Sequence, residues 1–526
     1  MVAVSVVESV EQPTREEVIT LQSRKTDELV VALVGPVGSG VSTTSEELIK
    51  VLEKDFGYGH HYIKVSDIIR SFAGVVGEDA PEEDDDESER IKKLQKIGNK
   101  MRDSFGEGYV AEKCVERIAV HRHQNDGYKS VGGKLVSRPR RVIHVIDSLK
   151  NPAEVDLLRD VYGEIFWVFG VFAPEEVRRS RLVKDGVKLS TITSIFEIDE
   201  DEGVSSGQKV RDTIEKSDFF IRNDDVNREK LEKSIRRFLD IIFGAKVNTP
   251  TRDEIAMYTA ASAATSSACL SRQVGAAIYT KEGELIGKGA NDVPKPKGGQ
   301  YCWEDQGNDH RCHKWEGRIC HNDDRKELLY KDITKKLKGA GIVGRDTEYD
   351  AIKKVLKKTD IKNLIEYSRA VHAEMEAIMS VVRGAKHGIV GSTLYCTTFP
   401  CHNCARHIVA SGISRVVYIE PYPKSLATVL HSDAISLQEG DAKGRVEFLQ
   451  YEGVAPRNML RLFSQGAARK EGGKAIEREP TDASPVSRSP LDGFHRREQI
   501  VVHRLQRAEA ETAEKTEGAG HDEAQG

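Results

Sequence analysis

The sequence predicts two α/β domains in one chain: a parallel sheet with helices on both faces, followed by an α/β/α sandwich. Three observations support this fold class. Apolar strand-like runs alternate with helical patterns over residues 28–246. A turn-forming segment at 248–251 marks the boundary between the two domains. A second alternating series follows it, and the second domain is expected at residues 247–464. At 526 residues, the chain is also too long for one ordinary domain.

In the first domain, the apolar run at 28–34 predicts a buried parallel strand. Further strands are expected at 60–65, 141–146, 165–171 and 219–221. Helices are expected at 90–105, 109–122, 152–161, 174–185 and 227–243. Residues 1–27 are polar without clear periodicity and are interpreted as a flexible lead-in.

A glycine-rich loop follows the first strand and opens a helix, which is the context of a phosphate-binding P-loop. Its backbone N–H groups would cradle phosphate, and Ser42 or Thr43 would hold Mg²⁺. The predicted nucleotide-binding residues are Gly35, Gly38, Ser39, Gly40, Val41, Ser42 and Thr43.

Val41 stands where such loops carry lysine, and a valine cannot neutralise a transferring phosphoryl group. We therefore expect a domain that binds a nucleotide and transfers phosphoryl groups poorly or not at all; a degenerate scaffold is the alternative. Asp147 closes the apolar run at 142–146 and is either a magnesium-orienting or substrate-contacting acid, or only a helix N-cap or a polar strand end. The basic residues considered as substitutes for the missing lysine are Lys25, Lys64, Lys100, Arg178 and Arg181.

The second domain contains a metal-binding pattern, His372-x-Glu374 followed by Pro400-Cys401-x-x-Cys404. This is the signature of the zinc-dependent deaminases, with His372, Cys401 and Cys404 as ligands and Glu374 left free. Three protein ligands leave a fourth position for water. Glu374 is expected to move a proton from water to the ring and then to the leaving amine. The pattern predicts hydrolytic release of ammonia from an amino-substituted ring.

Around this pattern we expect a helix at 253–268, strands at 273–279 and 284–290, and a Cys/His-rich insertion at 295–363. Metal-carrying helices at 368–382 and 401–410 flank a strand at 393–397, and another strand follows at 415–419. The tail, 465–526, has little apolar content and is expected to be disordered, with a short amphipathic helix at 499–508 as an alternative. Taken alone, a C-x-x-C pair also fits a structural zinc knuckle or a redox pair.

The insertion adds six sulfur or imidazole side chains between residues 300 and 323. A second, structural Zn²⁺ at Cys302, Cys312 and Cys320 is one interpretation, with Cys269 as a further ligand. Unliganded thiols in a reducing compartment are the other.

Net charge is −5 and aromatic content 6%, which disfavours a basic, aromatic-lined polynucleotide groove. No run of eighteen apolar residues and no signal-peptide pattern is present, so we expect a cytoplasmic protein that does not engage a membrane.

The second half resembles deoxycytidylate deaminases through residues 271–276, residues 289–294 and the zinc pattern. The first half resembles nucleoside monophosphate kinases through residues 145–152. The two joined resemble the bacterial anti-phage dCTP deaminases over about residues 28–465. That resemblance implies a cytidine deaminase-like sandwich and conversion of dCTP, and also dCMP, to uracil nucleotides. It implies that Asn291 contacts the sugar and that Tyr422 lines the base or phosphate end.

The resemblance further implies control through the P-loop domain, assembly into a homo-oligomer and a regulatory small RNA as partner. Three alternatives stay open at this stage. One is a tRNA or single-stranded DNA deaminase, the second a housekeeping dCMP deaminase supplying dUMP, and the third a non-catalytic nucleotide sensor. The free Glu374 argues against the last, since metal binding alone does not need it.

Overall fold

The computed structural model describes residues 25–131, 134–200, 207–224, 228–384, 388–422, 425–441, 443–465 and 468–522. Their placement divides the chain into two compact units. Unit 1 takes the described parts of Met1–Pro250 and Glu452–Gly526, and unit 2 is Thr251–Tyr451. The predicted flexible lead-in, apart from residues 25–27, lies outside the described residues.

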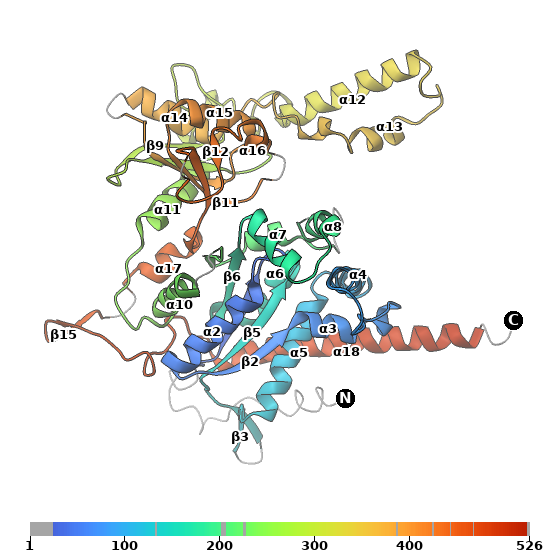
Figure 1. The fold of residues 1–526 in the computed structure, drawn as a ribbon, viewed down its shortest axis with the longest axis vertical. Coiled ribbons are helices and arrows are strands. Elements are labelled where there is room, and N and C mark those ends of the chain that lie inside the picture. The colour runs from blue at the N-terminus through green and yellow to red at the C-terminus, as the bar shows by residue number, and fades with distance from the viewer. Residues whose placement is uncertain are drawn as a thin grey trace. The chain divides into compact units, whose positions relative to one another are not determined.

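Unit 1 is built on a mainly parallel sheet with strand order β14-β7-β6-β1-β5-β2 (Figure 1). Strand β1 lies between β6 and β5 in the middle of the sheet. The connections on its two sides run in opposite directions, and ligands of such sheets usually bind at the carboxyl end of the strand at this point. The strand bounds are β1 Leu29–Val34, β2 Gly59–Lys64, β5 Val142–Leu149, β6 Phe166–Phe172, β7 Phe219–Arg222 and β14 Gly453–Val454.

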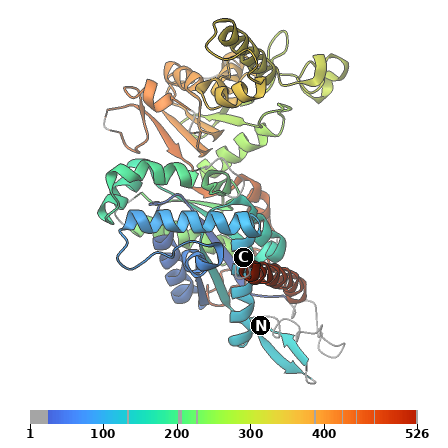
Figure 2. The same ribbon diagram turned by 90° about the vertical axis from the view of Figure 1, so that its right-hand side faces the viewer.

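Helices cover both faces of this sheet: α2 and α10 pack on one, and α3, α5 and α6 on the other. The β3–β4 hairpin projects from the unit (Figure 2). The bounds are α2 Val41–Phe56, α3 Val65–Ser71, α4 Glu87–Phe105, α5 Tyr109–Gln124, β3 Tyr128–Val131, β4 Lys134–Ser137, α6 Pro152–Tyr162, α7 Glu175–Lys184, α8 Leu189–Glu200, α9 Val210–Ile214, α10 Arg228–Phe243, α17 Met459–Phe463, β15 Lys470–Glu471, β16 Lys474–Ala475 and α18 Leu491–Asp522.

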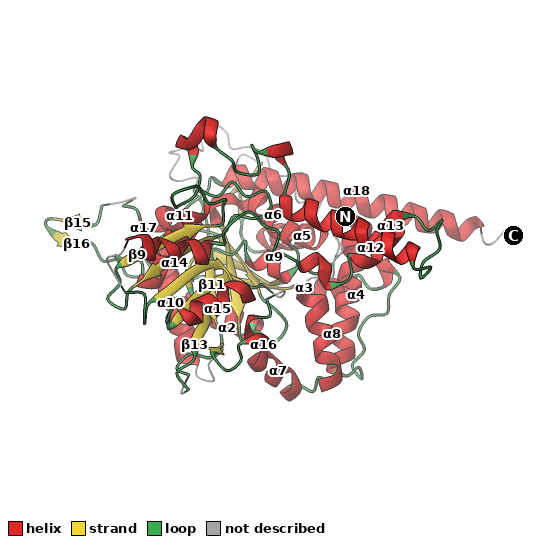
Figure 3. Cartoon of the chain, turned by 90° about the horizontal axis from the view of Figure 1, so that it is seen from above, coloured by secondary structure: helices red, strands yellow, loops and turns green. Residues whose placement is uncertain are grey.

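The C-terminal segment corrects two predictions. The second domain was expected to run to residue 464, but the chain returns to unit 1 at Glu452, where β14 pairs antiparallel with β7. The tail expected to be disordered contains the long helix α18 (Figure 3). Its apolar residues are few but periodic, and Leu491, Phe494, Val502 and Leu505 are buried, since α18 packs against α5 and α6.

A buried charge network anchors α18. Arg122 of α5 contacts Glu28 at 2.9 Å and Glu498 of α18 at 2.5 Å, and all three side chains are at most 3% exposed. Arg140 contacts the same Glu28 at 2.8 Å. Because a charge this deep in a protein is costly unless it is paired, the network fixes where α18 lies.

Unit 2 is an α/β/α sandwich, which confirms the predicted fold class. Its strand order is β12-β13-β11-β10-β8-β9, with α11 on one face and α14 and α15 on the other. Helices α12 and α13 pack on each other. The bounds are α11 Arg252–Ala264, β8 Gly275–Tyr279, β9 Leu285–Ala290, α12 His321–Gly339, α13 Tyr349–Leu356, α14 Ala373–Gly384, β10 Thr393–Thr398, α15 His402–Ala410, β11 Arg415–Glu420, α16 Ala427–Leu430, β12 Ile435–Ser436 and β13 Val446–Gln450.

Helix α14 begins at Ala373, five residues after its predicted start. The residues before it, 368–372, are not helical, and Val371 forms a bridge with Asp292. None of the helices that the structure describes is both long and apolar enough to cross a lipid bilayer.

Candidate zinc site and nucleotide pocket

Two helix N-termini carry the residues of the zinc pattern. His372 directly precedes α14, and its carbonyl accepts a hydrogen bond from the Glu376 N–H at 2.9 Å. Cys401 is the N-cap residue of α15, and Cys404 lies in the first turn. His372 Nδ1 is 3.4 Å from each of the two sulfurs. The structure thus brings together the three predicted ligands.

These residues fit a zinc ion. Tetrahedral zinc places a cysteine sulfur and a histidine nitrogen about 3.6 Å apart, close to the 3.4 Å found here. Hydrogen bonds from Cys404 and His372 lower the pKa of Cys401 to about 4, which favours the thiolate that binds metal. The positive ends of two helix dipoles favour the same charge.

A close approach of β9 sets the position of α14. A Cβ at Gly289 would lie 2.5 Å from the main-chain nitrogen of Ala377 and 2.6 Å from the carbonyl oxygen of Ala373. Only glycine allows the strand to pass this close to the helix that follows His372.

Glu374 lies in the first turn of α14 and is only 4% exposed. Burial raises the pKa of its carboxyl group, because a low-dielectric surrounding disfavours the charged form. A carboxylate with a raised pKa can take up a proton and give it back during one reaction. Its position beside the three predicted ligands and its raised pKa suit a proton carrier, and that role stays a prediction.

A cavity of about 360 Å³ opens on this site, a volume within the range of small-molecule pockets. His372, Glu374 and Cys401 line one part of it together with Phe399 and Tyr422. The basic side chains that line it are Arg272, Lys326, Lys362 and Arg369. Of these, Lys326, Lys362 and Arg369 were not singled out as site residues from the sequence, although Arg369 precedes the metal histidine by only three residues.

Asn291 lines the same cavity, and both ends of its amide already have partners. Its Oδ1 accepts from the Val274 N–H and its Nδ2 donates to the Arg272 carbonyl, each at 2.7 Å. Asn291 thus holds the loop that precedes β8. Nδ2 carries a second hydrogen that a ligand could use, and the predicted sugar contact stays a prediction.

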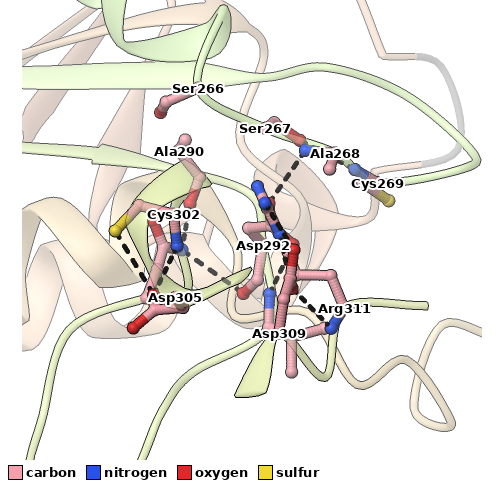
Figure 4. Close-up of polar contacts among 12 residues, drawn as sticks. Ser266, Ser267, Ala268, Cys269, Ala290, Asp292, Cys302, Asp305, Asp309 and Arg311 are labelled. Atoms are coloured by element: carbon pink, nitrogen blue, oxygen red, sulfur yellow. Dashed lines mark hydrogen bonds and ion pairs between the residues drawn. The ribbon is translucent and has the colours of Figure 1, made fainter. Parts of the chain in front are cut away.

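Asp292 ties the insertion to the pocket wall (Figure 4). Its Oδ2 accepts from the Ala268 N–H at 2.8 Å and lies 3.7 Å from Arg311 of the insertion. Arg311 in turn forms a close ion pair with Asp309 at 2.7 Å. The insertion is therefore part of the site's architecture, and Cys312 and Cys320 line the cavity with it.

The geometry provides no preformed ligand set for the predicted second zinc. Within the described parts of the chain, the groups of metal-ligating atoms that lie within 4.8 Å of one another include none of the insertion cysteines. The Cys302 thiol instead donates a hydrogen bond to the Asp305 carboxylate, with 3.2 Å between Sγ and Oδ2. It is exposed, whereas Cys312 and Cys320 are half-buried.

The P-loop lies between β1 and α2 as predicted. Gly40 has a φ of 83°, and a Cβ there would lie 2.2 Å from Asn223 Nδ2, so the position needs glycine. Ser42 donates to Asp147 Oδ2 at 2.8 Å. A loop serine beside an acid at a strand end is the pair that holds Mg²⁺ in P-loop enzymes. Asn151 caps α6, so the helix-cap interpretation of Asp147 is corrected. Asp147 lies near the end of β5, as the strand-end interpretation expected.

Side chains of unit 1 already contact the P-loop. Asp199 of α8 accepts a hydrogen bond from the Val37 N–H at 2.7 Å. Lys150 donates to Asp199 at 2.8 Å and to the Gly35 carbonyl at 2.9 Å. Arg181 donates to the Gly38 and Ser39 carbonyls, each at 3.2 Å. The Asp199 carboxylate therefore already accepts a hydrogen bond from one of the N–H groups that would bind phosphate.

A buried valine stands where P-loops carry lysine, and two other basic side chains contact the loop. Val41 is only 8% exposed and packs in the core of unit 1, where an ammonium group would be buried unpaired. Of the five substitutes considered, Arg181 contacts the loop, whereas Lys100 pairs with Glu78. Lys150, which sequence reasoning did not single out for this role, brings a second cation to the loop.

Residues 250–420 match the family described as the cytidine and deoxycytidylate deaminase zinc-binding region. Over 55 residues, 10% of the chain, the sequence is 44% identical to the deoxycytidylate deaminases of Enterobacteria phages T2 and T4. The match spans 29% and 28% of those proteins, less than a third of their length.

Further relatives include UPF0200 proteins of Saccharolobus and Archaeoglobus. The chain is 21% identical over 211 residues to one from Saccharolobus islandicus, which covers 40% of the chain and 92% of that protein. It is 24% identical over 210 residues to a UPF0200/UPF0201 protein of Archaeoglobus fulgidus, or 54% of that protein.

Solved structures similar to this chain include the dCMP deaminase of cyanophage S-TIM5 in complex with dCMP and dUMP. It is 19% identical, and the alignment covers 39% of this chain and 99% of that one with a TM-score of 0.22. Shikimate kinase from Acinetobacter baumannii is 13% identical, with coverage of 44% and 100% and a TM-score of 0.24.

Proposed function

We propose that unit 2 catalyses zinc-dependent hydrolytic deamination of a deoxycytidine nucleotide, dCTP or dCMP, to the deoxyuridine nucleotide. One observation carries the proposal: His372, Cys401 and Cys404 converge beside the buried Glu374 in a pocket that admits a small molecule. The family matched by residues 250–420 supports the same chemistry.

A zinc ion bound by these ligands would supply an activated water as nucleophile. Glu374 would take one proton from this water and give it to the ring nitrogen, then take the second proton of the same water and give it to the departing amino group. The C–N bond to the amino group breaks, a C=O bond forms from the water oxygen, and ammonia leaves. The buried surroundings of Glu374 keep bulk water from competing for its proton.

The charge of the pocket supports a phosphorylated substrate. Arg369 stacks on the Trp315 ring, with its guanidinium 3.7 Å from the ring centroid, and Arg272 pairs with Glu420 at 2.5 Å. Both groups are therefore held in place at the pocket, where a planar guanidinium binds phosphate oxygens well. Lys326 and Lys362 add positive charge on the side of the insertion.

A substrate panel tests the proposal. Purified full-length protein is incubated with dCTP, dCMP, deoxycytidine and a cytosine-containing oligonucleotide, and ammonia and uracil products are followed. We expect turnover of at least one deoxycytidine nucleotide and little turnover of the free nucleoside. Turnover confined to the oligonucleotide would assign the site to polynucleotide deamination and refute the proposal.

We further propose that a nucleotide bound at the P-loop controls deamination. The Ser42–Asp147 pair and the loop glycines provide the binding elements, and the valine at Val41 argues against efficient phosphoryl transfer. Labelled nucleotide should bind the wild-type protein and fail to bind Gly40→Asp. Deamination by that variant should lose its response to added nucleotide while its zinc content stays unchanged.

In cells we propose that this activity depletes the dCTP pool during phage infection. Expression of the wild-type chain, compared with a Glu374→Gln variant, should lower cellular dCTP and phage yield together. An unchanged phage yield with a lowered dCTP pool would favour a housekeeping role. The proposed homo-oligomer and small-RNA partner are tested by light scattering and by sequencing RNA that co-purifies with the chain.

A further inference from the structure

A second group of metal-ligating side chains lies in unit 1, away from the zinc pattern. It consists of His61 on β2, His144 on β5 and His121 in the last turn of α5. In the parallel register, His61 lies directly opposite His144, so both side chains point to the same face of the sheet. Helix α5 packs on these two strands (Figure 1).

The three imidazoles are close enough to share one ion. His61 Nδ1 is 3.1 Å from His144 Nδ1, and two histidine nitrogens on one tetrahedral zinc are about 3.4 Å apart. The His121 ring stacks on His61 with centroids 4.0 Å apart. One ligand atom from each of the three residues lies within 4.8 Å of the others.

A hydrogen bond between His61 and His144 would by itself explain the distance of 3.1 Å between them. It would not provide partners for the other buried ring nitrogens of the cluster. His121 Nδ1 and His144 Nε2 are buried and have no hydrogen-bond partner among the described residues. Orphaned buried nitrogens of this kind are rare and call for a partner. An ion at the cluster would satisfy the His121 nitrogen.

The second ring nitrogen of His144 faces a carboxylate. His144 Nε2 lies 3.6 Å from Glu28 Oε2, which matches the outer arrangement in which a metal-bound histidine is oriented by a carboxylate. Burial lowers the pKa of His61 to about 3 and that of His144 to about 4. It also lowers the pKa of His121. At neutral pH all three rings are therefore uncharged, the form that binds metal.

One ligand of the cluster lies beside an open hollow. His121 is in its wall, whereas His61 and His144 do not line it. Arg138, Arg140 and Arg141 also line the hollow and oppose a cation there. Each of them has a partner: Arg138 pairs with Asp126 at 3.8 Å, Arg140 with Glu28 at 2.8 Å, and Arg141 donates to the Ala483 carbonyl at 2.9 Å.

We propose that His61, His121 and His144 form a binding site for a divalent transition metal of the zinc class, independent of the deaminase zinc. The site joins two strands of the unit 1 sheet to the helix that receives α18. It does not rest on the proposed function, because its ligands belong to the P-loop unit.

Metal stoichiometry of the full-length protein tests this site. Protein stripped with chelator and titrated with Co²⁺ should bind two equivalents. His121→Gln and His61→Gln, both changes at half-buried positions, should each bind one equivalent and keep the sulfur-to-cobalt absorption of the cysteine site. Cys401→Ser should lose that absorption and still bind one equivalent at a site with only nitrogen and oxygen ligands.

His123→Ala is the matched control, since His123 is exposed and lies on α5 two residues after His121; it should bind two equivalents. Added Zn²⁺ should raise the melting temperature of Cys401→Ser but not that of the same protein with His121→Gln added. Binding of one equivalent by wild type would overturn the proposal. So would two equivalents retained by both histidine variants.

Discussion

Replacing Glu374 by glutamine removes the proton carrier and leaves its volume nearly unchanged. Asp292 also lines the pocket, but its carboxylate is bound to the Ala268 and Val293 N–H groups and cannot take over. One positioned proton carrier contributes about 10²–10⁴-fold to a rate. Glu374 serves more than one transfer, so we expect a loss of at least about 10³-fold in kcat, equivalent to about 4 kcal/mol.

The assay follows ammonia release from dCMP and dCTP alongside zinc content and melting temperature. Zinc should stay bound, because the three ligands are intact, and the fold should survive, because burial already disfavours the charge of Glu374. The matched control is Glu376→Gln, a buried acid two residues further along α14 that pairs with Arg383. Its kcat should stay near wild type. Full activity in Glu374→Gln with zinc bound would refute the assigned role.

Three further changes test other parts of the account. Cys404→Ser should lower zinc affinity by more than the roughly 10–100-fold of an outer-shell change and abolish ammonia release; retained zinc and activity would exclude it as a ligand. Asp199→Asn removes a charge-assisted hydrogen bond of about 1.5–3 kcal/mol from the P-loop, so labelled nucleotide should bind roughly 10–100-fold more tightly; unchanged affinity would show that Asp199 does not compete with phosphate. Glu498→Ala leaves Arg122 with one buried partner fewer and should lower the free energy of unfolding by about 1.5–3 kcal/mol. Denaturant titration measures this loss. A change within experimental error would mean that the ion pair does not hold α18.

Local patterns gave most of the fold. The apolar run of β1, the strand–helix alternation and the zinc pattern each depend on residues close together in the sequence. The predicted ligands converge because α14 and α15 begin directly after His372 and Cys401. The spacing predicted the start of the second helix, whereas the first begins five residues later than predicted. The two-domain α/β class is confirmed on this basis.

Long-range pairing explains what the sequence did not reveal. The return of Glu452 to the first sheet and the docking of α18 depend on partners more than two hundred residues away. Asp199 reaches the P-loop across 162 residues, again without a local signal. The apolar residues of α18 are spaced for a helix, but the charged composition around them hides the pattern.

Deamination in water enriched in oxygen-18 tests the central claim most directly. Wild-type protein loaded with zinc is given dCMP or dCTP, and the uracil nucleotide is analysed by mass spectrometry. Hydrolytic attack at the carbon that carries the amino group predicts one oxygen-18 atom in the base of each product molecule and one ammonia released per molecule. A zinc-loaded, folded protein that forms no labelled uracil nucleotide from either substrate would contradict the account.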